Sequence, residues 1–292
     1  MDVKTRISNL KFDDMTKDET IRVIRLLKSA LLQQKNEKYD PFNVYTITQS
    51  EFTNNSLGIE NPNFSINKQQ ISRIYEDGYL YDCNKYLNIQ TVEEITGHYL
   101  LFNEMLDTLN DELSQELIKK YHYIFKHDVF IERVNGHPCG EYKKTDNNTK
   151  TEQFVKPAKV KKTMQELIDW YNNQPKDLLR IIRFLVEFDK IHPFYSGNGI
   201  IGRMLVFKEC LKNDIFPVIF KDESPFSAIN YHENMKSAKE QDNLLILQIG
   251  FGFAAKKYQQ QYFELIQSSL SEYQTSQAAS KSYAPAEKKD KN

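Results

Sequence analysis

Apolar residues recur at helical spacing along most of this 292-residue chain. The first run places four of them on one face of a helix: Ile21, Ile24, Leu27 and Leu31. Thr16 and Glu19 precede this run at the spacing of a capping box, a pair of side chains that bonds two free N–H groups at a helix start. The charged stretch 35–40 and the following Pro41 end the predicted helix.

The same periodicity predicts further helices as far as residue 260. They span 65–78, 92–109, 114–124, 164–171, 181–189, 204–211, 230–239 and 244–260. Residues 45–53 are ambiguous, because the run V-Y-T-I-T at 44–48 is rich in β-branched residues and could form a strand instead of a helix. Ser65 and Ser114 are expected as N-caps, and Gly78 as a helix end. Trp170, the only tryptophan, is expected in the core.

Two segments depart from helical spacing. Residues 136–157 are polar, and a turn at 146–149 (D-N-N-T) separates the runs E-Y-K-K and E-Q-F-V, which predicts a β-hairpin. From Ser269 onward the chain is mostly Ser, Gln, Ala, Lys and Asp, a composition that predicts a disordered tail. Every other predicted element is helical, so we expect an all-α fold.

Composition narrows the partners and the compartment. Lys+Arg 39 and Asp+Glu 40 leave a net charge of −1, which gives no reason to expect nucleic acid as the main partner. The lysines of the hairpin are interpreted as solvated: Lys143, Lys144, Lys150 and Lys156. Cys83, Cys139 and Cys210 are odd in number and widely spaced, as is typical of a reducing compartment. Without an apolar leader or a bilayer-length apolar run, a cytoplasmic protein with no membrane span is expected.

Three histidines fall on or near helices predicted for the middle of the chain: His98, His122 and His127. None has a carboxylate partner at the spacing of a metal site, so no metal is assigned to them. We interpret them as ordinary helix or surface histidines.

Candidate chemistry gathers in residues 191–203, I-H-P-F-Y-S-G-N-G-I-I-G-R. Pro193 disfavours helical geometry at His192, so the preceding helix should end there. Gly197-Asn198-Gly199 lets the backbone turn its N–H groups toward a ligand, and such groups at a helix start favour an anion. Arg203 adds a guanidinium suited to phosphate oxygens, and His192 can take up a proton near neutral pH. The stretch therefore predicts a phosphate cradle beside a base.

This stretch resembles the Fic family signature, H-x-F-x-[DE]-G-N-G-R-x-x-R. The matching positions are His192, Phe194, Gly197, Asn198, Gly199 and Arg203. Two positions depart, because Ser196 replaces the acid and Ile200 replaces the first arginine. The resemblance runs from about Phe52 to Phe251 and implies an all-α Fic-type helical domain with a small β-hairpin flap. It divides the chain into an N-terminal helical region (1–85), a Fic core (86–255) and a helix end with the tail (256–292).

The resemblance implies a protein adenylyltransferase, which transfers AMP from ATP to a Ser, Thr or Tyr hydroxyl of a protein. His192 would be the base, and buried Phe194 would fix the loop. The implied nucleotide-binding residues are Ser196, Gly197, Asn198, Gly199, Gly202, Arg203, Tyr231 and Asn234. The flap at 140–157 would dock an unknown target protein, and a homo-oligomer stays open.

A second motif implies autoinhibition. Residues 56–61, S-L-G-I-E-N, fit the pattern [ST]-x-x-x-E-[GN] of the inhibitory helix of many Fic proteins, with Ser56, Glu60 and Asn61 at its defining positions. In the class with this helix before the core, the glutamate pairs with the second motif arginine. Glu60 would therefore compete with the terminal phosphate for Arg203.

The two departures leave three functions open. Serine is a weak ligand for Mg²⁺, so at Ser196 the ion would ride mainly on phosphates and water and be held loosely. Ile200 removes a positive charge. The chain could be a weakened AMP transferase, could use another phosphate-containing donor, or could bind nucleotide or a partner protein with little or no catalysis.

Overall fold

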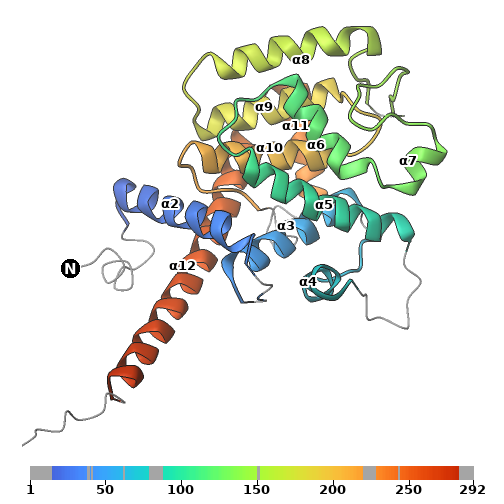
Figure 1. Cartoon of the computed structure of the whole chain (residues 1–292). Helices are drawn as coiled ribbons and strands as arrows, with labels where there is room; N and C mark the ends of the chain where they lie inside the picture. The colour runs from blue at the N-terminus through green and yellow to red at the C-terminus, as the bar shows by residue number, and fades with distance from the viewer. Residues whose placement is uncertain are drawn as a thin grey trace, which may run out of the picture.

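The computed structural model describes residues 15–37, 40, 42–61, 63–78, 88–149, 152–219, 228–242 and 244–282. Within these ranges the regular structure is helical and contains no strand (Figure 1). The helices are α2 (Lys17–Gln34), α3 (Val44–Glu60), α4 (Lys68–Asp77), α5 (Ile89–Asp107), α6 (Gln115–Lys126), α7 (Phe130–Val134), α8 (Pro157–Asn172), α9 (Leu178–Ile191), α10 (Asn198–Lys212), α11 (Ala228–Gln241) and α12 (Leu245–Ser282). The expected all-α fold is confirmed.

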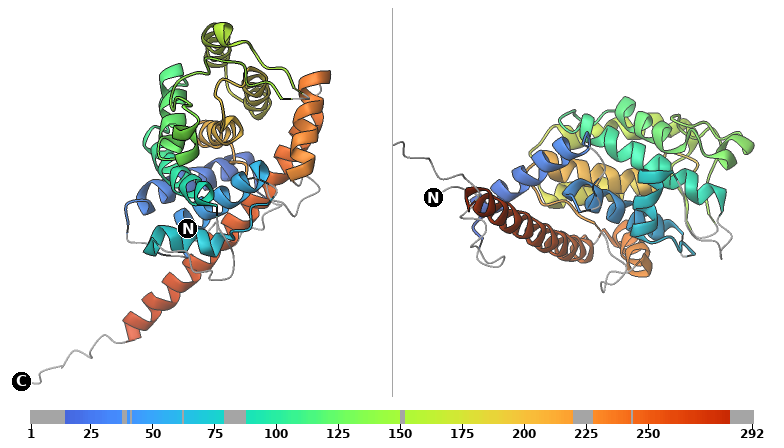
Figure 2. Two further views of the ribbon diagram at one scale, coloured as in Figure 1. Left: turned by 90° about the vertical axis from the view of Figure 1, so that its right-hand side faces the viewer. Right: turned by 60° about the horizontal axis from the view of Figure 1, so that its bottom comes forward.

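Helix α10 forms the centre of the molecule. All its residues from Ile200 to Leu211 are buried, because α9, α3, α5 and α6 pack around it. Figures 1 and 2 show α10 between the N-terminal helices on one side and α8 and α9 on the other. The mainly apolar sequence of α10 accounts for this position, since a helix that is apolar all round is stable only when it is covered on all sides.

Helix α3 is buried despite a polar sequence, and several of its polar side chains are paired. Thr48 bonds the Tyr258 hydroxyl at 2.6 Å, and Thr53 bonds His98 Nδ1 at 2.9 Å. Glu51 is 3 % exposed and forms an ion pair with Lys68 at 2.9 Å. These bonds offset the desolvation of the buried groups and fix α3 in one orientation. Its last turn, which ends at Glu60, lies at the start of α10.

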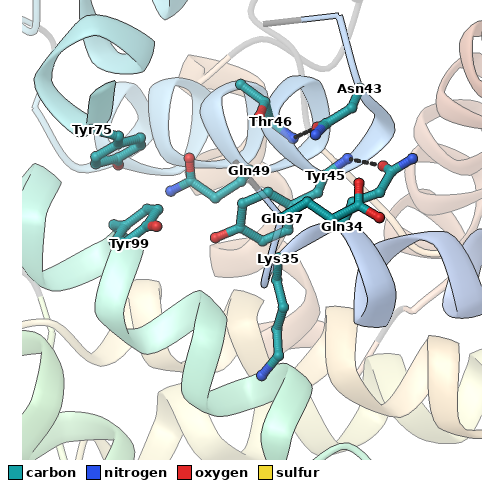
Figure 3. A pocket seen from close by; sticks show the side chains of 9 residues that line it. All are labelled: Gln34, Lys35, Glu37, Asn43, Tyr45, Thr46, Gln49, Tyr75 and Tyr99. Atoms are coloured by element: carbon teal, nitrogen blue, oxygen red, sulfur yellow. Dashed lines mark hydrogen bonds between the residues drawn. The ribbon is translucent and has the colours of Figure 1, made fainter. Parts of the chain in front are cut away.

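A small polar cavity lies where α2, α3, α4 and α5 meet (Figure 3). Its walls include Gln49 and the phenol rings of Tyr45, Tyr75 and Tyr99. The volume of about 70 Å³ suits a few water molecules and is too small for a nucleotide.

Local signals place several helix ends as expected. The Thr16–Glu19 capping box is formed, Ser114 caps α6, and Gly78 ends α4 in the left-handed conformation. The ambiguous run 44–48 is helical. Other ends differ: Asn67 rather than Ser65 caps α4. None of the described helices is long and apolar enough to cross a membrane.

The predicted β-hairpin is a folded-back flap without strands in its described residues, 136–149 and 152–156. Its backbone groups bond elsewhere: the N–H groups of Lys144 and Thr145 donate to the Tyr195 hydroxyl, and that of Lys143 donates to Pro193 O. These flap N–H groups therefore bond the motif loop instead of a second strand. Across the turn, the Thr149 N–H donates to Glu152 O, the Glu152 N–H donates to the Thr149 hydroxyl, and the Phe154 N–H donates to Asn148 Oδ1.

Three further expectations were wrong. Lys143 of the flap is 3 % exposed and donates to Asn147 Oδ1 at 2.6 Å, although the flap lysines were interpreted as solvated. Helix α12 continues to Ser282 and projects from the body in Figure 1, although the chain from Ser269 was predicted to be disordered. Its Ser, Gln and Ala residues are compatible with extending a helix already formed. Trp170 is 39 % exposed rather than buried, because it lies on the solvent face of α8 beneath the Arg180 guanidinium, 4.1 Å from its ring centroid.

Some expectations lie outside what the structure describes. Cys83, Lys150 and the tail beyond Ser282 are not among the described residues. The division of the chain at residues 85 and 255 stays a prediction.

Two glycines give a matched test of the packing. A Cβ on Gly97 of α5 would lie 2.3 Å from the Phe125 carbonyl oxygen of α6, whereas a Cβ on Gly58 of α3 would meet nothing within 4 Å. We expect Gly97→Ala to destabilise the protein by about 1–3 kcal/mol through overpacking. Gly58→Ala should be neutral or stabilising by up to about 1 kcal/mol. Chemical denaturation measures both, and a Gly97→Ala variant as stable as the parent would contradict the close contact of α5 with α6.

Candidate functional site

The glycine turn of the motif forms the N-terminus of α10. The helix begins at Asn198 rather than at the predicted residue 204, so Arg203 lies in its second turn. Gly197 is the N-cap with φ 73°, and a Cβ there would also lie 3.1 Å from Lys126 Cε. The Asn198 amide locks the loop, since Oδ1 accepts from the Phe194 N–H and Nδ2 donates to the Phe194 carbonyl, both at 2.9 Å. The first N–H groups of a helix have no intrahelical acceptor and remain available to a ligand.

The His122 side chain packs against this loop and positions it. Sequence analysis did not identify this role. Its ring stacks on Phe194 with centroids 3.9 Å apart. Nδ1 accepts from the Gly140 N–H of the flap at 2.9 Å, so Nε2 carries the proton and donates to Ser196 O at 3.2 Å. Burial lowers the pKa of His122 to about 3, which keeps the ring neutral. No spacing rule links residue 122 to 194; only the packing of α6 brings them together.

His192 stands at the C-terminus of α9 in the left-handed conformation, with φ 48°. Its ring stacks on Phe154 of the flap, with centroids 4.0 Å apart. Nδ1 lies 3.9 Å from Asp189 Oδ1. Burial lowers the pKa of His192 below its ordinary value, while the Asp189 carboxylate opposes that shift. The imidazole is therefore neutral at pH 7 and able to accept a proton.

Arg203 is buried and paired with the last turn of α3. Its Nη2 donates to Glu60 Oε1 at 2.7 Å and to the Ser56 carbonyl at 2.9 Å, and Nε donates to the Ser56 hydroxyl at 2.9 Å. Burial opposes its charge, but Glu60 and Tyr231 outweigh it, so the pKa of Arg203 is raised. Nη1 is buried without a hydrogen-bond partner in the described structure. The guanidinium thus keeps one unused donor near Gly199.

His192, Arg203 and Glu60 face one cavity of about 300 Å³. Gly199 and Tyr231 also line it, and the Tyr231 ring centroid lies 5.4 Å from Arg203 Cζ. Asn234 is not among the lining residues. Sequence analysis missed six polar residues at this wall, on α11, the flap and α9: His232, Glu233, Lys236, Lys239, Glu152 and Asp189. The motif loop, α9, α10 and α11 therefore meet at the cavity where the sequence predicted nucleotide binding.

Glu60 also lines a second cavity of about 310 Å³, on the far side of its carboxylate. Its walls include Asn61, Ser196, Gly197 and Ile200. Ile200 is 1 % exposed and offers only hydrocarbon. Gly202 lines neither cavity, because it faces α9, where a Cβ would lie 2.7 Å from Leu185 Cδ1.

The residues around Ser196 do not fit a magnesium ion. The Ser196 hydroxyl donates to Glu132 Oε1, the same oxygen lies 3.3 Å from Lys126 Nζ, and Glu132 Oε2 bonds His137 Nδ1 at 2.9 Å. Burial raises the pKa of Glu132, but these donors outweigh it and the pKa is lowered. Mg²⁺ needs free oxygen ligands, whereas both oxygens of this carboxylate already accept bonds. Among the described residues no group of three or more His, Cys, Asp or Glu could hold a metal.

The fold and this loop define the class: an all-α domain whose central helix begins at a glycine turn. Residues 112–209 match the model of the Fic/DOC family. None of the curated proteins matches the sequence significantly. The matched residues include the stretch 191–203 on which the motif resemblance rests.

Two solved structures are similar to the chain. A Fic domain-containing signalling protein from Bacteroides thetaiotaomicron is 18 % identical, with 86 % of this chain and 93 % of that chain covered at a TM-score of 0.58. Fic-1 from C. elegans is 19 % identical, with 86 % and 73 % covered at a TM-score of 0.63. At 18 % and 19 % sequence identity, the similarity to these two structures shows only a common fold.

The charge state of His192 can be tested without knowing a substrate. Because burial outweighs Asp189, its pKa should lie below 6.5, and the ring should gain its proton only as the pH falls through that lowered value. Heteronuclear NMR, with the resonance assigned by His192→Gln, measures this titration. Asp189→Asn removes the opposing carboxylate and should lower the pKa further. A pKa of 6.5 or above would contradict the burial of the ring.

Proposed function

We propose that this protein is a Fic-type protein adenylyltransferase held inactive by Glu60. The observation that carries the proposal is the shared cavity: the neutral imidazole of His192 and the guanidinium of Arg203 face the same space, and the Glu60 carboxylate occupies the guanidinium at 2.7 Å. A base and a cation beside a helix N-terminus suit phosphoryl transfer, which depends mostly on positioning and charge stabilisation.

In the proposed reaction a Ser, Thr or Tyr hydroxyl of a target protein enters beside His192. Its oxygen attacks the α-phosphorus of ATP, and His192 takes the hydroxyl proton. The bond from the α-phosphorus to the bridging oxygen breaks, and pyrophosphate leaves with that electron pair. The N–H groups at the start of α10 stabilise the charge on the α-phosphate, and Arg203 holds the terminal phosphates. Phe154 stacks on His192, so the flap borders the position of the target.

Glu60 inhibits through two physical effects. Its carboxylate occupies the Arg203 Nη2 donor that a terminal phosphate would otherwise use. It is also the one described residue that lines both cavities, of about 300 and 310 Å³, so its side chain would meet a ligand that entered both. Because the Glu60 side chain is 37 % exposed and that of Arg203 is 2 % exposed, the glutamate is the partner that can leave toward water.

Removing Glu60 should activate the enzyme. We expect Glu60→Ala to raise incorporation of label from α-labelled ATP into the protein itself or an added target at least about tenfold, the size of one charge-assisted contact. Glu233→Ala is the matched control, because Glu233 is another acid at the same cavity but is not the residue paired with Arg203. In the Glu60→Ala protein, His192→Ala should reduce labelling by about 10²–10⁴. Equal labelling with and without His192 would rule out its role as the base.

A second candidate is nucleotide binding without turnover. It is favoured by the Ser196 hydroxyl, which is bonded to Glu132 at a position where the motif has an acid. This candidate expects Glu60→Ala to bind nucleotide in calorimetry while no label transfers from any nucleoside triphosphate. Transfer from a different nucleotide, but not from ATP, would instead indicate another donor.

A further inference from the structure

The cavity on the Ile200 side of Glu60 contains an unassigned cation. Lys126, the last residue of α6, is the one basic side chain among the described residues that line it. Arg203 lines only the other cavity. Ile200, which stands at the motif position for an arginine, contributes no charge here. A triphosphate that spanned both cavities would thus meet Lys126 in one, and Arg203 with Lys236 and Lys239 in the other.

Lys126 lies close to the start of α10. Its Cε would lie 3.1 Å from a Cβ on Gly197, the N-cap residue, so the lysine stem fills the space beside the glycine turn. Its Nζ lies 3.3 Å from Glu132 Oε1, the oxygen that also accepts the Ser196 hydroxyl. The ammonium group is therefore held beside the residue at the motif's metal-binding position.

The Lys126 side chain is buried, so the cost of removing its charge from water must be compensated. Its side chain is 3 % exposed, and removing an ammonium group from water is expensive unless it is paired. Glu94 provides the shortest contact, at 2.6 Å, with a side chain that is 19 % exposed. An apolar residue at 126 with a neutral residue at 132 would fill this place without that penalty, so packing alone does not account for the buried ion pair here.

The Lys126–Glu94 pair has the same construction as the Arg203–Glu60 pair. In each, a buried cation at the glycine turn is held by a carboxylate that is partly exposed: 3 % against 19 %, and 2 % against 37 %. A partly exposed carboxylate can turn toward water at lower cost than a buried one. Phosphate oxygens can then replace it on the cation.

We propose that Lys126 binds the polyphosphate of the donor directly, in place of both the missing arginine and a tightly held magnesium ion. The inference rests on the proposed function, because it requires a nucleotide at the glycine turn. Arg203 Nη1, buried and without a partner in the described structure, supplies an independent donor aimed at the same helix start. Glu132 remains bonded to Ser196 and keeps Lys126 in position, and Glu94 is the carboxylate that phosphate displaces.

Calorimetry with ATP tests this in the full-length Glu60→Ala protein, in EDTA and in excess MgCl₂. Affinity should change by less than about threefold between the two conditions, because Lys126 supplies the charge. Lys126→Met should weaken binding in EDTA by about 10- to 100-fold, the range of one lost charge-assisted contact. Lys120→Met is the matched control, since Lys120 is on the same helix but is exposed and paired with Glu104.

Two further variants separate phosphate binding from stability. Lys126→Met/Glu132→Gln leaves no unpaired buried carboxylate, so it should fold and still bind ATP weakly. Glu94→Gln removes the competing carboxylate and should tighten binding of both ATP and inorganic tripolyphosphate several-fold. A lysine that served only the fold would not give this gain.

The outcomes distinguish this inference from the proposed function. If ATP binds with strict dependence on Mg²⁺ and with equal affinity in Lys126→Met, the role of Lys126 is overturned while the proposed function survives. A loss of stability in Lys126→Met with unchanged ATP affinity overturns it equally. If the Glu60→Ala protein binds neither ATP nor tripolyphosphate, both proposals fail.

Discussion

The buried guanidinium of Arg203 is the constraint on which the site depends. It is 2 % exposed, and a cation so placed is stable only if it is paired. Ser56 and Glu60, in the last turn of α3, accept bonds from its Nε and Nη2, so the same bonds that dock α3 onto α10 place a carboxylate in the cavity. The bonds that attach the end of α3 to α10 and the carboxylate at the cavity wall are therefore parts of one interaction.

A second constraint comes from the neutral ring of His122. It joins three segments that are distant in sequence: it stacks on Phe194, donates to the Ser196 carbonyl and accepts from Gly140 of the flap. Because burial keeps the ring uncharged, its tautomer is fixed and both bonds persist across neutral pH. These contacts fix the position of the flap relative to the motif loop. Phe154 of the flap is thereby placed against the imidazole of His192.

The two departures from the motif are accompanied by charges from other helices. Ser196 bonds Glu132 of α7, and Lys126 of α6 lies between Glu132 and Glu94. The carboxylate and the cation that the motif lacks therefore lie nearby, on side chains outside it. The Glu132 carboxylate differs from the motif's acid in its chemistry. It already accepts hydrogen bonds on both oxygens and is therefore a poor metal ligand.

The sequence by itself determined what depends on neighbouring residues. The Thr16–Glu19 box, the left-handed Gly78, the end of α9 at His192 before Pro193 and the turn at Gly197 all follow from local backbone sterics and capping. The two motifs also identified His192, Arg203 and Glu60 as residues of one site. Tertiary structure alone decided which side chains from α6 and α7 reach the loop, which side of α8 exposes Trp170, and that the flap bonds Tyr195 rather than itself. These contacts join residues far apart in the chain, and periodicity records which face of a helix is buried but not what that face meets.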